Sequence, residues 1–172
     1  MVDIESLQQF IGVSSGQMRA VDAVEPGSVR KFVQAIMDED PIYWDDEVKG
    51  ATQYGGLVAP YLYPAHMLRR YAGTPDPLDC FADNEDFDGL EMSSYGLPPL
   101  PLPYSRALNG GGEVEFYSLA NHGDQVFATS RYADVQVREG STGQMIFVTI
   151  ETTYAKQTGQ LLEKVRETLV WR

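Results

Sequence analysis

The acidic end of the first strongly helical segment is the place in this sequence where chemistry is most expected. The segment runs into three consecutive acids, Asp38, Glu39 and Asp40. Acids at a helix C-terminus oppose the helix dipole, at a cost of about 0.3–1 kcal/mol each when they are exposed. Asp40 has a structural explanation, because Asp before Pro41 is a typical N-cap of a following helix. Asp38 has no such explanation and is therefore a candidate functional residue.

A second candidate segment begins at the Gly55-Gly56 turn and continues into a helical pattern over residues 60–71. Pro60 and Pro64 are compatible with this helix only within its first turn, where a missing N–H has no intrahelical partner. The free N–H groups and the dipole at such a helix start favour a developing oxyanion. An ordinary buried helix start is the alternative interpretation.

Together these two segments resemble the MaoC-like (R)-specific enoyl-CoA hydratases and hydroxyacyl dehydratases, which have the hot-dog fold. That family has Asp-x-x-Pro-Ile/Leu-His, then a Gly-Gly turn and an Ala-His-Gly helix start. Here Asp38 matches the catalytic aspartate, Tyr43 replaces the histidine, and residues 59–61 read Ala-Pro-Tyr. The sequence is therefore more similar to the "MaoC dehydratase N-terminal" branch, found as a degenerate half of double hot dogs and as the weak subunit of heterodimeric dehydratases. The resemblance covers roughly residues 24–72 and 108–172.

This resemblance implies roles for individual residues. Hydration of a 2-enoyl thioester needs a base for water, an acid for Cα and donors for the thioester oxygen. The family places the donor N–H at the position of Tyr61, and we assign Pro60, Gly56 and Arg106 to the same substrate-binding region. Asp38 and Tyr43 would hold a water, but a phenol with a pKa near 10 is a donor rather than a base at pH 7. Asp38 therefore has two open interpretations, a chemical role or a relic that caps a loop.

The charge of the chain limits its ligands. A formal net charge of −12 disfavours nucleic acid and also disfavours polyanions such as coenzyme A, unless a local basic patch is present. Arg69, Arg70 and Arg106 are the best candidates for that patch. They are alternatively solvated surface charges, and a partner chain would then supply the basic surface.

Other reactive side chains are few. His66, His122 and Cys80 are the only residues of their types, and no metal-ligand spacing, Ser-His-Asp motif or Cys-His motif is present. We interpret His66 as a helix histidine and His122 as a solvent-facing loop residue, and we expect neither a metal nor a cofactor. The glycines at 110–112 precede a strand rather than a helix, so they are not a phosphate loop. We expect them to let the backbone pass close to a ligand or to the central helix.

Hydrophobic periodicity predicts an α+β protein. Long runs rich in Val, Ile, Thr and Tyr, joined by short glycine turns, predict an antiparallel, strongly bent sheet. The expected strands are 18–24, 114–117, 125–138, 144–156 and 160–172, and the expected helices are 6–11, 25–38, 41–48 and 60–71. With the last helix in the concave face, this is the hot-dog arrangement.

Length and composition favour a single domain over residues 1–172. Residues 73–103 differ from the rest, with six of the ten prolines. We expect this insertion to be a flap over the ligand site, with a Pro-rich recognition ligand as the alternative. A single cysteine fits a reducing cytoplasm, and neither a membrane-spanning run nor a signal segment is apparent.

These observations lead to one main functional hypothesis. The chain is expected to be a cytoplasmic subunit of an (R)-specific 2-enoyl-thioester hydratase or 3-hydroxyacyl-thioester dehydratase that shapes the acyl tunnel beside a catalytic hot-dog chain. Its ligand would be an acyl-CoA or acyl-carrier-protein thioester, and the chain alone would be weak or inactive. The alternative is a non-catalytic hot-dog homodimer that binds acyl thioesters or other hydrophobic ligands. A hot-dog thioesterase ranks third, because residues 61–71 lack the acid that such enzymes carry on the central helix.

Overall fold

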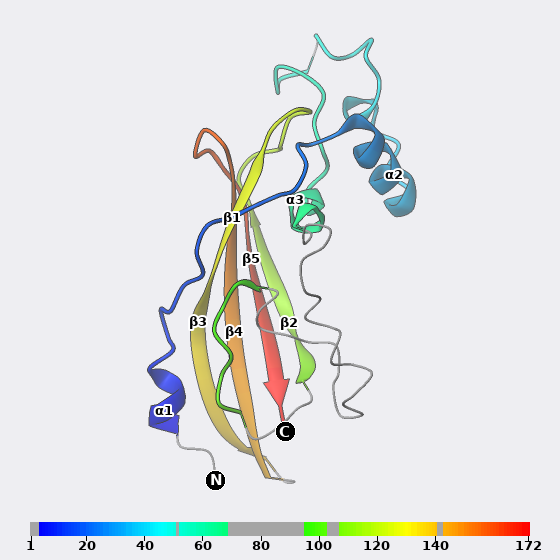
Figure 1. The fold of residues 1–172 in the computed structure, drawn as a ribbon. Helices are drawn as coiled ribbons and strands as arrows, with labels where there is room; N and C mark the ends of the chain where they lie inside the picture. Colours follow the sequence, from blue (N-terminus) through cyan, green and yellow to red (C-terminus); the bar gives the residue numbers. More distant parts are fainter. Residues whose placement is uncertain (1–3, 51, 69–94, 103–106, 141–142) are drawn as a thin grey trace, which may run out of the picture.

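The computed structural model describes residues 4–50, 52–68, 95–102, 107–140 and 143–172. Within these ranges the chain forms short helices around one antiparallel sheet (Figure 1). The elements in chain order are α1 (Ile4–Gln8), β1 (Met18–Arg19), α2 (Pro26–Ile36), the 3₁₀ helix η1 (Pro41–Tyr43), α3 (Tyr63–Met67), β2 (Ala107–Phe116), β3 (Val126–Gly140), β4 (Gly143–Lys156) and β5 (Leu161–Trp171).

The sheet has the strand order β1-β3-β4-β5-β2, and every pair in it is antiparallel. Strands β3 and β4 form a long hairpin whose register runs from Val126 opposite Lys156 to Gly140 opposite Gly143. Side chains alternate between the two faces, so Ile146, Val148 and Ile150 all point into the core. The expected long antiparallel strands are therefore confirmed.

Two hydrophobic clusters cover the sheet, one towards each end. Figure 1 shows α2 and α3 near one end of the curved sheet and α1 near the other. The first cluster joins α2, η1 and α3 to the sheet through Val29, Val33, Tyr43, Val58, Tyr63, Val126, Tyr154 and Leu162, among others. The second contains Leu7, Leu97, Leu100, Tyr132, Val135, Ile146, Val148, Ile150, Leu169 and Trp171. A bent sheet with a helix packed against it is the hot-dog arrangement, as expected.

The central helix differs from the expectation in its limits. It begins at Tyr63 rather than at residue 60, because Leu62 takes a left-handed conformation (φ 67°) as the N-cap residue. Pro60 therefore lies before the helix, whereas Pro64 lies in the first turn as expected. The helix ends at Met67, and residues 69–71 of the expected helix lie outside the described ranges.

Several other expectations need correction. The helix expected over 41–48 is only the 3₁₀ turn η1, and the strand expected over 18–24 has only two residues. The glycine run lies inside β2, where a Cβ on Gly110 would be 2.9 Å from the Thr168 carbonyl oxygen. Gly110 therefore permits a close approach between β2 and β5.

The Pro-rich insertion is described only at its C-terminal end, residues 95–102. Leu97 and Leu100 are buried in the second cluster, and the Tyr132 hydroxyl donates a 2.6 Å hydrogen bond to the Pro98 carbonyl oxygen. This part of the insertion is thus core rather than a flap. The remainder of the expected flap lies outside the described residues, as does Cys80.

Candidate functional site

Asp38 is positioned by an unusual helix end. Helix α2 stops at Ile36, and Met37 adopts a left-handed conformation (φ 56°, ψ 38°). The Asp38 N–H then donates to the Val33 carbonyl oxygen at 3.1 Å, which closes the helix end in the manner of a Schellman motif. A left-handed conformation costs a residue with a side chain roughly 1–2 kcal/mol, and the Met37 side chain is nevertheless 87% exposed. Such strain at an exposed apolar residue marks this turn as a candidate functional segment.

The acids after the turn form two local caps. Asp38 Oδ1 accepts a 3.2 Å hydrogen bond from the Asp40 N–H, and Asp40 Oδ1 accepts one of 3.1 Å from the Ile42 N–H. Asp40 is thus the N-cap residue of η1, with Pro41 directly after it, as predicted. The loop-capping interpretation of Asp38 is also supported, because its carboxylate organises the turn.

Tyr43 lies beside Asp38, so the structure brings together the two predicted catalytic residues. Its ring is buried in the first cluster. Burial, followed by the negative charges of Asp38 and Asp40, raises the pKa of Tyr43 to about 12. At neutral pH the Tyr43 hydroxyl is therefore firmly protonated beside Asp38, and it is unable to act as a base.

His122 is a neighbour of this site that sequence reasoning placed in solvent. It is half-buried, and burial lowers its pKa, although the backbone groups of Tyr43 and Val58 act in the opposite direction. Its Nε2 atom is buried without a hydrogen-bond partner among the described residues. The isolated bridge between Val58 and Asn121 brings the loop that contains His122 to this site. No sequence pattern within the loop indicates that pairing.

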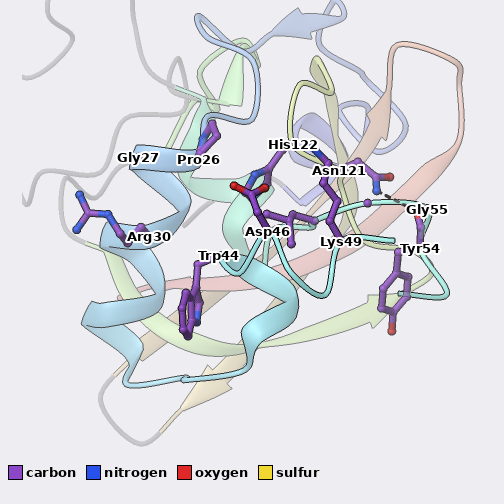
Figure 2. A pocket seen from close by; sticks show the side chains of 12 residues that line it. Pro26, Gly27, Arg30, Trp44, Asp46, Lys49, Tyr54, Gly55, Asn121 and His122 are labelled. Carbon is purple, nitrogen blue, oxygen red and sulfur yellow. Dashed lines mark hydrogen bonds between the residues drawn. The ribbon is translucent and has the colours of Figure 1, made fainter. Parts of the chain in front are cut away.

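Two cavities meet at Trp44, a half-exposed residue that the sequence did not single out. The first, of about 500 Å³, lies between α2, the Gly55-Gly56 turn and His122 (Figure 2). The second, of about 510 Å³, is lined by Met37, Asp38 and Trp44 among others. Together they form a candidate ligand-binding region beside the Asp38–Tyr43 pair.

The basic side chains at these cavities are not the predicted ones. Arg30 lines both cavities and Lys49 lines the first, whereas Arg69, Arg70 and Arg106 lie outside the described residues. In Figure 2 the side chains of Lys49, Asp46 and His122 lie close together within the first cavity. Arg30 and Lys49 are the cations that an anionic ligand would meet here, but Asp46 lines the first cavity with them and Asp38 and Glu39 line the second.

Gly56 is buried at the first cavity as part of a tight turn. Its N–H and carbonyl both hydrogen-bond with the Thr52 hydroxyl, at 3.3 Å and 2.9 Å. A Cβ at this position would lie 3.7 Å from Asn121 Nδ2, which is ordinary contact distance. In the Gly55-Gly56 pair, position 55 is the one that requires glycine, because its φ is 74°.

At the start of the central helix, the N–H of the residue after the expected donor Tyr61 is bound within the protein. The Leu62 N–H donates a 2.9 Å hydrogen bond to Oε2 of Glu163, which is only 1% exposed. Pro60 is buried just before the helix, and the exposed Tyr61 ring packs on Phe116 with 4.3 Å between ring centroids. Sequence reasoning missed Glu163, which is 101 residues from Leu62 along the chain.

Neither a metal-ligand cluster nor a membrane-spanning helix occurs in the described part of the chain. Across these ranges, no group of three or more His, Cys, Asp or Glu side chains is arranged to hold a metal ion. None of the helices there is long and apolar enough to cross a lipid bilayer.

The bent sheet, its helix and the Asp38 turn define a hot-dog protein with a dehydratase-type segment in which tyrosine replaces histidine. A family model described as the FAS1-like dehydratase domain region matches residues 9–165, and the chain belongs to this family.

Relatives and solved structures agree with this assignment. The chain is 27% identical over 169 residues to the "Probable enoyl-CoA hydratase alpha subunit" of Thermomonospora curvata, with 96% of this chain but only 49% of the relative covered. It is 26% identical to a "UPF0336 protein" of Saccharopolyspora erythraea, with 96% and 90% covered. The chain therefore spans about half the length of the first relative and most of the second.

The fold matches a chain of the ChsH1-ChsH2 complex from Mycobacterium tuberculosis, with a TM-score of 0.70, 19% identity and coverage of 97% of this chain and 94% of that one. It also matches the (R)-hydratase from A. caviae involved in PHA biosynthesis, with a TM-score of 0.57, 14% identity and coverage of 90% and 93%. At these identities the matches establish the fold.

Proposed function

We propose that this chain is the tunnel-shaping subunit of an (R)-specific 2-enoyl-thioester hydratase or 3-hydroxyacyl-thioester dehydratase. The dehydratase family and the hydratase-subunit name of a relative support this class of reaction. The protonation state of Tyr43 is the observation on which the proposed role as a tunnel-shaping subunit depends. A protonated phenol held against Asp38 stands where the family has a histidine that exchanges protons with water.

The chemistry of hydration makes this substitution costly. A base must remove a proton from water while the oxygen adds to Cβ, and an acid must deliver a proton to Cα. Here Tyr43 remains protonated and cannot accept a proton from water, and Asp38 Oδ1 already accepts the Asp40 N–H. This half-site can therefore hold polar atoms but turns over poorly, and the chemistry belongs to a partner chain with an intact Asp-x-x-Pro-x-His.

The surface that would meet this partner is the open edge of the sheet. Among the described strands, β2 pairs with β5 on one side only, and an unpaired edge strand invites pairing with another sheet. Large apolar side chains are exposed beside it, namely Tyr61, Leu62, Leu108, Phe116 and Tyr117. A ChsH1-ChsH2 complex and an HadBC complex are among the structures with this fold, which supports a heteromeric assembly.

The ligand would be an acyl thioester carried by coenzyme A or by an acyl-carrier protein. The apolar side chains of Val33, Met37 and Trp44 line the cavity next to Asp38. Arg30 and Lys49 lie on the adjoining surface, where a phosphate-bearing carrier would find its countercharge.

The experiment that tests this function is an assay of crotonyl-CoA hydration. The purified chain alone should be nearly inert, because loss of a positioned acid or base typically costs ~10²–10⁴-fold in rate. Addition of a hot-dog partner with both catalytic residues should restore activity, and Asp38→Asn should then change the rate little. Asp40→Asn is the matched control, because asparagine retains the N-cap.

A lone chain that turns over near ~10 s⁻¹ and loses this activity with Asp38→Asn would refute the subunit role. Binding of acyl thioester by a homodimer, without activity in the presence of any partner, would favour the alternative of a non-catalytic binding protein. Light scattering decides between a homodimer and a monomer that awaits its partner.

A further inference from the structure

Lys156 is a buried lysine at the C-terminal end of β4 that the proposed function does not use. Its side chain is 8% exposed, and its Nζ atom lies 2.8 Å from Oδ2 of Asp124. Burial raises the pKa of Asp124, but the hydrogen bonds from Lys156, the Asn121 N–H and Gln157, together with the charge of Lys156, outweigh it and lower the pKa. A buried ion pair is weak evidence for stability, because apolar side chains of similar volume often serve equally well. Its clearest structural consequence is the orientation of its neighbours.

The neighbour that Lys156 orients is the side-chain amide of Asn121. Lys156 Nζ donates a 2.8 Å hydrogen bond to Oδ1 of Asn121. A lysine ammonium has donors only, so the amide oxygen faces Lys156 and the amide nitrogen points the other way. The Asn121 N–H donates to Oδ2 of Asp124 at 2.8 Å, which also holds the backbone of this residue. The amide is therefore fixed in one orientation.

The nitrogen of this amide faces the glycine turn at the first cavity. Asn121 Nδ2 donates a 3.0 Å hydrogen bond to the Tyr54 carbonyl oxygen (Figure 2). Asn121 lines the cavity together with Gly56 and Leu57, among others. An amide nitrogen carries two N–H donors, and Tyr54 is the one acceptor that the described residues give it. One donor therefore remains for a ligand.

Gly56 leaves this donor open to the cavity. Its φ lies outside the left-handed region, and a Cβ at this position would be 3.7 Å from Asn121 Nδ2, an ordinary contact distance. Neither backbone conformation nor crowding therefore requires glycine here. A methyl group would nevertheless stand against Nδ2 and cover it from the cavity.

The charges near the amide favour a neutral acceptor rather than a phosphate. Lys156, the cation that contacts the amide, is already neutralised by Asp124. Arg30 and Lys49 line the same cavity, but Asp46 lines it with them, and the chain has a formal net charge of −12. A carbonyl oxygen accepts a hydrogen bond without needing a countercharge. In a thioester carrier, such carbonyl groups occur in the amides of the pantetheine arm.

We propose that Asn121 is a specificity-determining residue that donates a hydrogen bond to an amide carbonyl of a pantetheine arm in the first cavity. Lys156 is the positioning residue that fixes the amide, and Gly56 keeps the donor accessible. This inference rests on the proposed function for the class of ligand, an acyl thioester. Because coenzyme A and acyl-carrier protein share the arm, the same contact serves either carrier.

An NMR titration of the full chain with D-pantetheine tests this contact directly. The side-chain amide signals of Asn121 should shift as pantetheine is added, and those of Asn109, which is exposed on β2, should not. Asn121→Asp keeps an oxygen towards Lys156 and replaces the donor by an acceptor. The Kd for pantetheine should therefore rise about tenfold, the loss expected for one hydrogen bond.

Gly56→Ala is a second variant that leaves the bond between Lys156 and Asn121 intact. Its methyl group should weaken pantetheine binding several-fold and change the unfolding midpoint little. Gly16→Ala is the matched control and should bind like the wild type, because Gly16 is exposed and an added Cβ would meet no atom within 4 Å. Asn121 signals that ignore millimolar pantetheine, or an unchanged affinity in folded Gly56→Ala, would overturn the proposal.

Further probes identify the carrier and separate this contact from the proposed function. Of coenzyme A and a holo-acyl-carrier protein, the natural carrier should reproduce the Asn121 shift, and a shift with neither would count against the contact. Inorganic pyrophosphate should leave the Asn121 signals in place; a shift with pyrophosphate instead of pantetheine would also overturn the proposal. Pantetheine binding at Asn121 without hydratase activity in any complex would refute the proposed function alone. Hydratase activity with a KM that Asn121→Asp leaves unchanged would refute this contact alone.

Discussion

The two faces of the sheet each bury a glutamate, and they do so in opposite ways. Glu151 on β4 is 4% exposed, and Glu163 on β5 is 1% exposed. Tyr154, the register partner of Glu163, is three residues from Glu151 along β4, so the two glutamates point to opposite faces. Glu151 receives 2.8 Å contacts from Arg131 Nη2 and from Arg166 Nε. Among the described residues, Glu163 receives a hydrogen bond from the Leu62 N–H and pairs with no cation.

This difference shows that burial alone does not decide the state of a carboxylate. Burial raises the pKa of Glu151, but the hydrogen bonds of Arg131 and Arg166 and the charges of Arg131 and Lys164 outweigh it, and the pKa falls below its ordinary value. Burial also raises the pKa of Glu163, and the N–H groups of Leu62 and Ala65 do not compensate. The arginines thus favour the ionised form of Glu151, whereas the surroundings of Glu163 in the described part of the chain favour its neutral form.

The largest loss of stability among the variants that test this comparison is expected at Glu151. Glu151→Gln removes the charge between two arginines and should lower the free energy of unfolding by about 2 kcal/mol, less than the ~3–5 kcal/mol of a fully buried pair because both arginines are partly exposed. Urea denaturation at pH 7 measures this change. Glu113→Gln makes the same chemical change at an exposed position and should be nearly silent; equal losses in the two variants would show that the arginine pairs contribute nothing.

The sequence could predict the Asp38 side of the site because the information is local. Hydrophobic periodicity gave α2 and the long strands, and the Asp-Pro pair correctly indicated the η1 cap. Asp38 and Tyr43 are separated by one short turn, so their proximity follows from that local geometry.

The Glu163 side could not be predicted, because it depends on a break in the alternation of β5. A register shift between Tyr154 and Ala155 places Leu162 and Glu163 together in the interior. Strict alternation would put one of these two residues in solvent, and the polar surroundings of Glu163 in the sequence favour that reading. His122 was misplaced for a similar reason, since its burial depends on a long-range bridge.

The pH dependence of stability gives a smaller effect that also distinguishes Glu163 from Glu151. The folded-state pKa of Glu163 is raised, so its ionisation removes stability as pH climbs from the ordinary glutamate value near ~4.3 to the raised value. The folded-state pKa of Glu151 is lowered, so its contribution is present above that ordinary value and is lost as pH falls through the lowered one.

Denaturation curves between acid and neutral pH measure both effects. Relative to the wild type, Glu163→Gln should gain stability as pH rises, and Glu151→Gln should lose its deficit as pH falls. Parallel curves for the wild type and Glu163→Gln would mean that Glu163 has an ordinary pKa in the folded protein. That result would remove the contrast between the two faces.

The smallest effect is expected at the exposed end of the Glu151 network. Glu115 on β2 contacts Arg166 at 2.7 Å and accepts a 2.7 Å hydrogen bond from the Tyr117 hydroxyl. The Tyr117 hydrogen bond is the largest effect and lowers the pKa of Glu115. Burial opposes it, and the charge and hydrogen bond of Arg166 add to the lowering. These side chains are well exposed, so solvent and salt screen the pair.

Glu115→Gln in the lone chain should therefore shift the unfolding midpoint less than either buried variant, and high salt should abolish the shift. The same strand edge is the surface that we propose for the partner chain, and water would be excluded from it on assembly. The effect of Glu115→Gln should accordingly grow when the partner is bound, and it should become less sensitive to salt. Comparing the midpoints of the variant and the wild type with and without partner, at low and high salt, measures this change. An effect that stays small and salt-sensitive in the complex would place the partner on another surface.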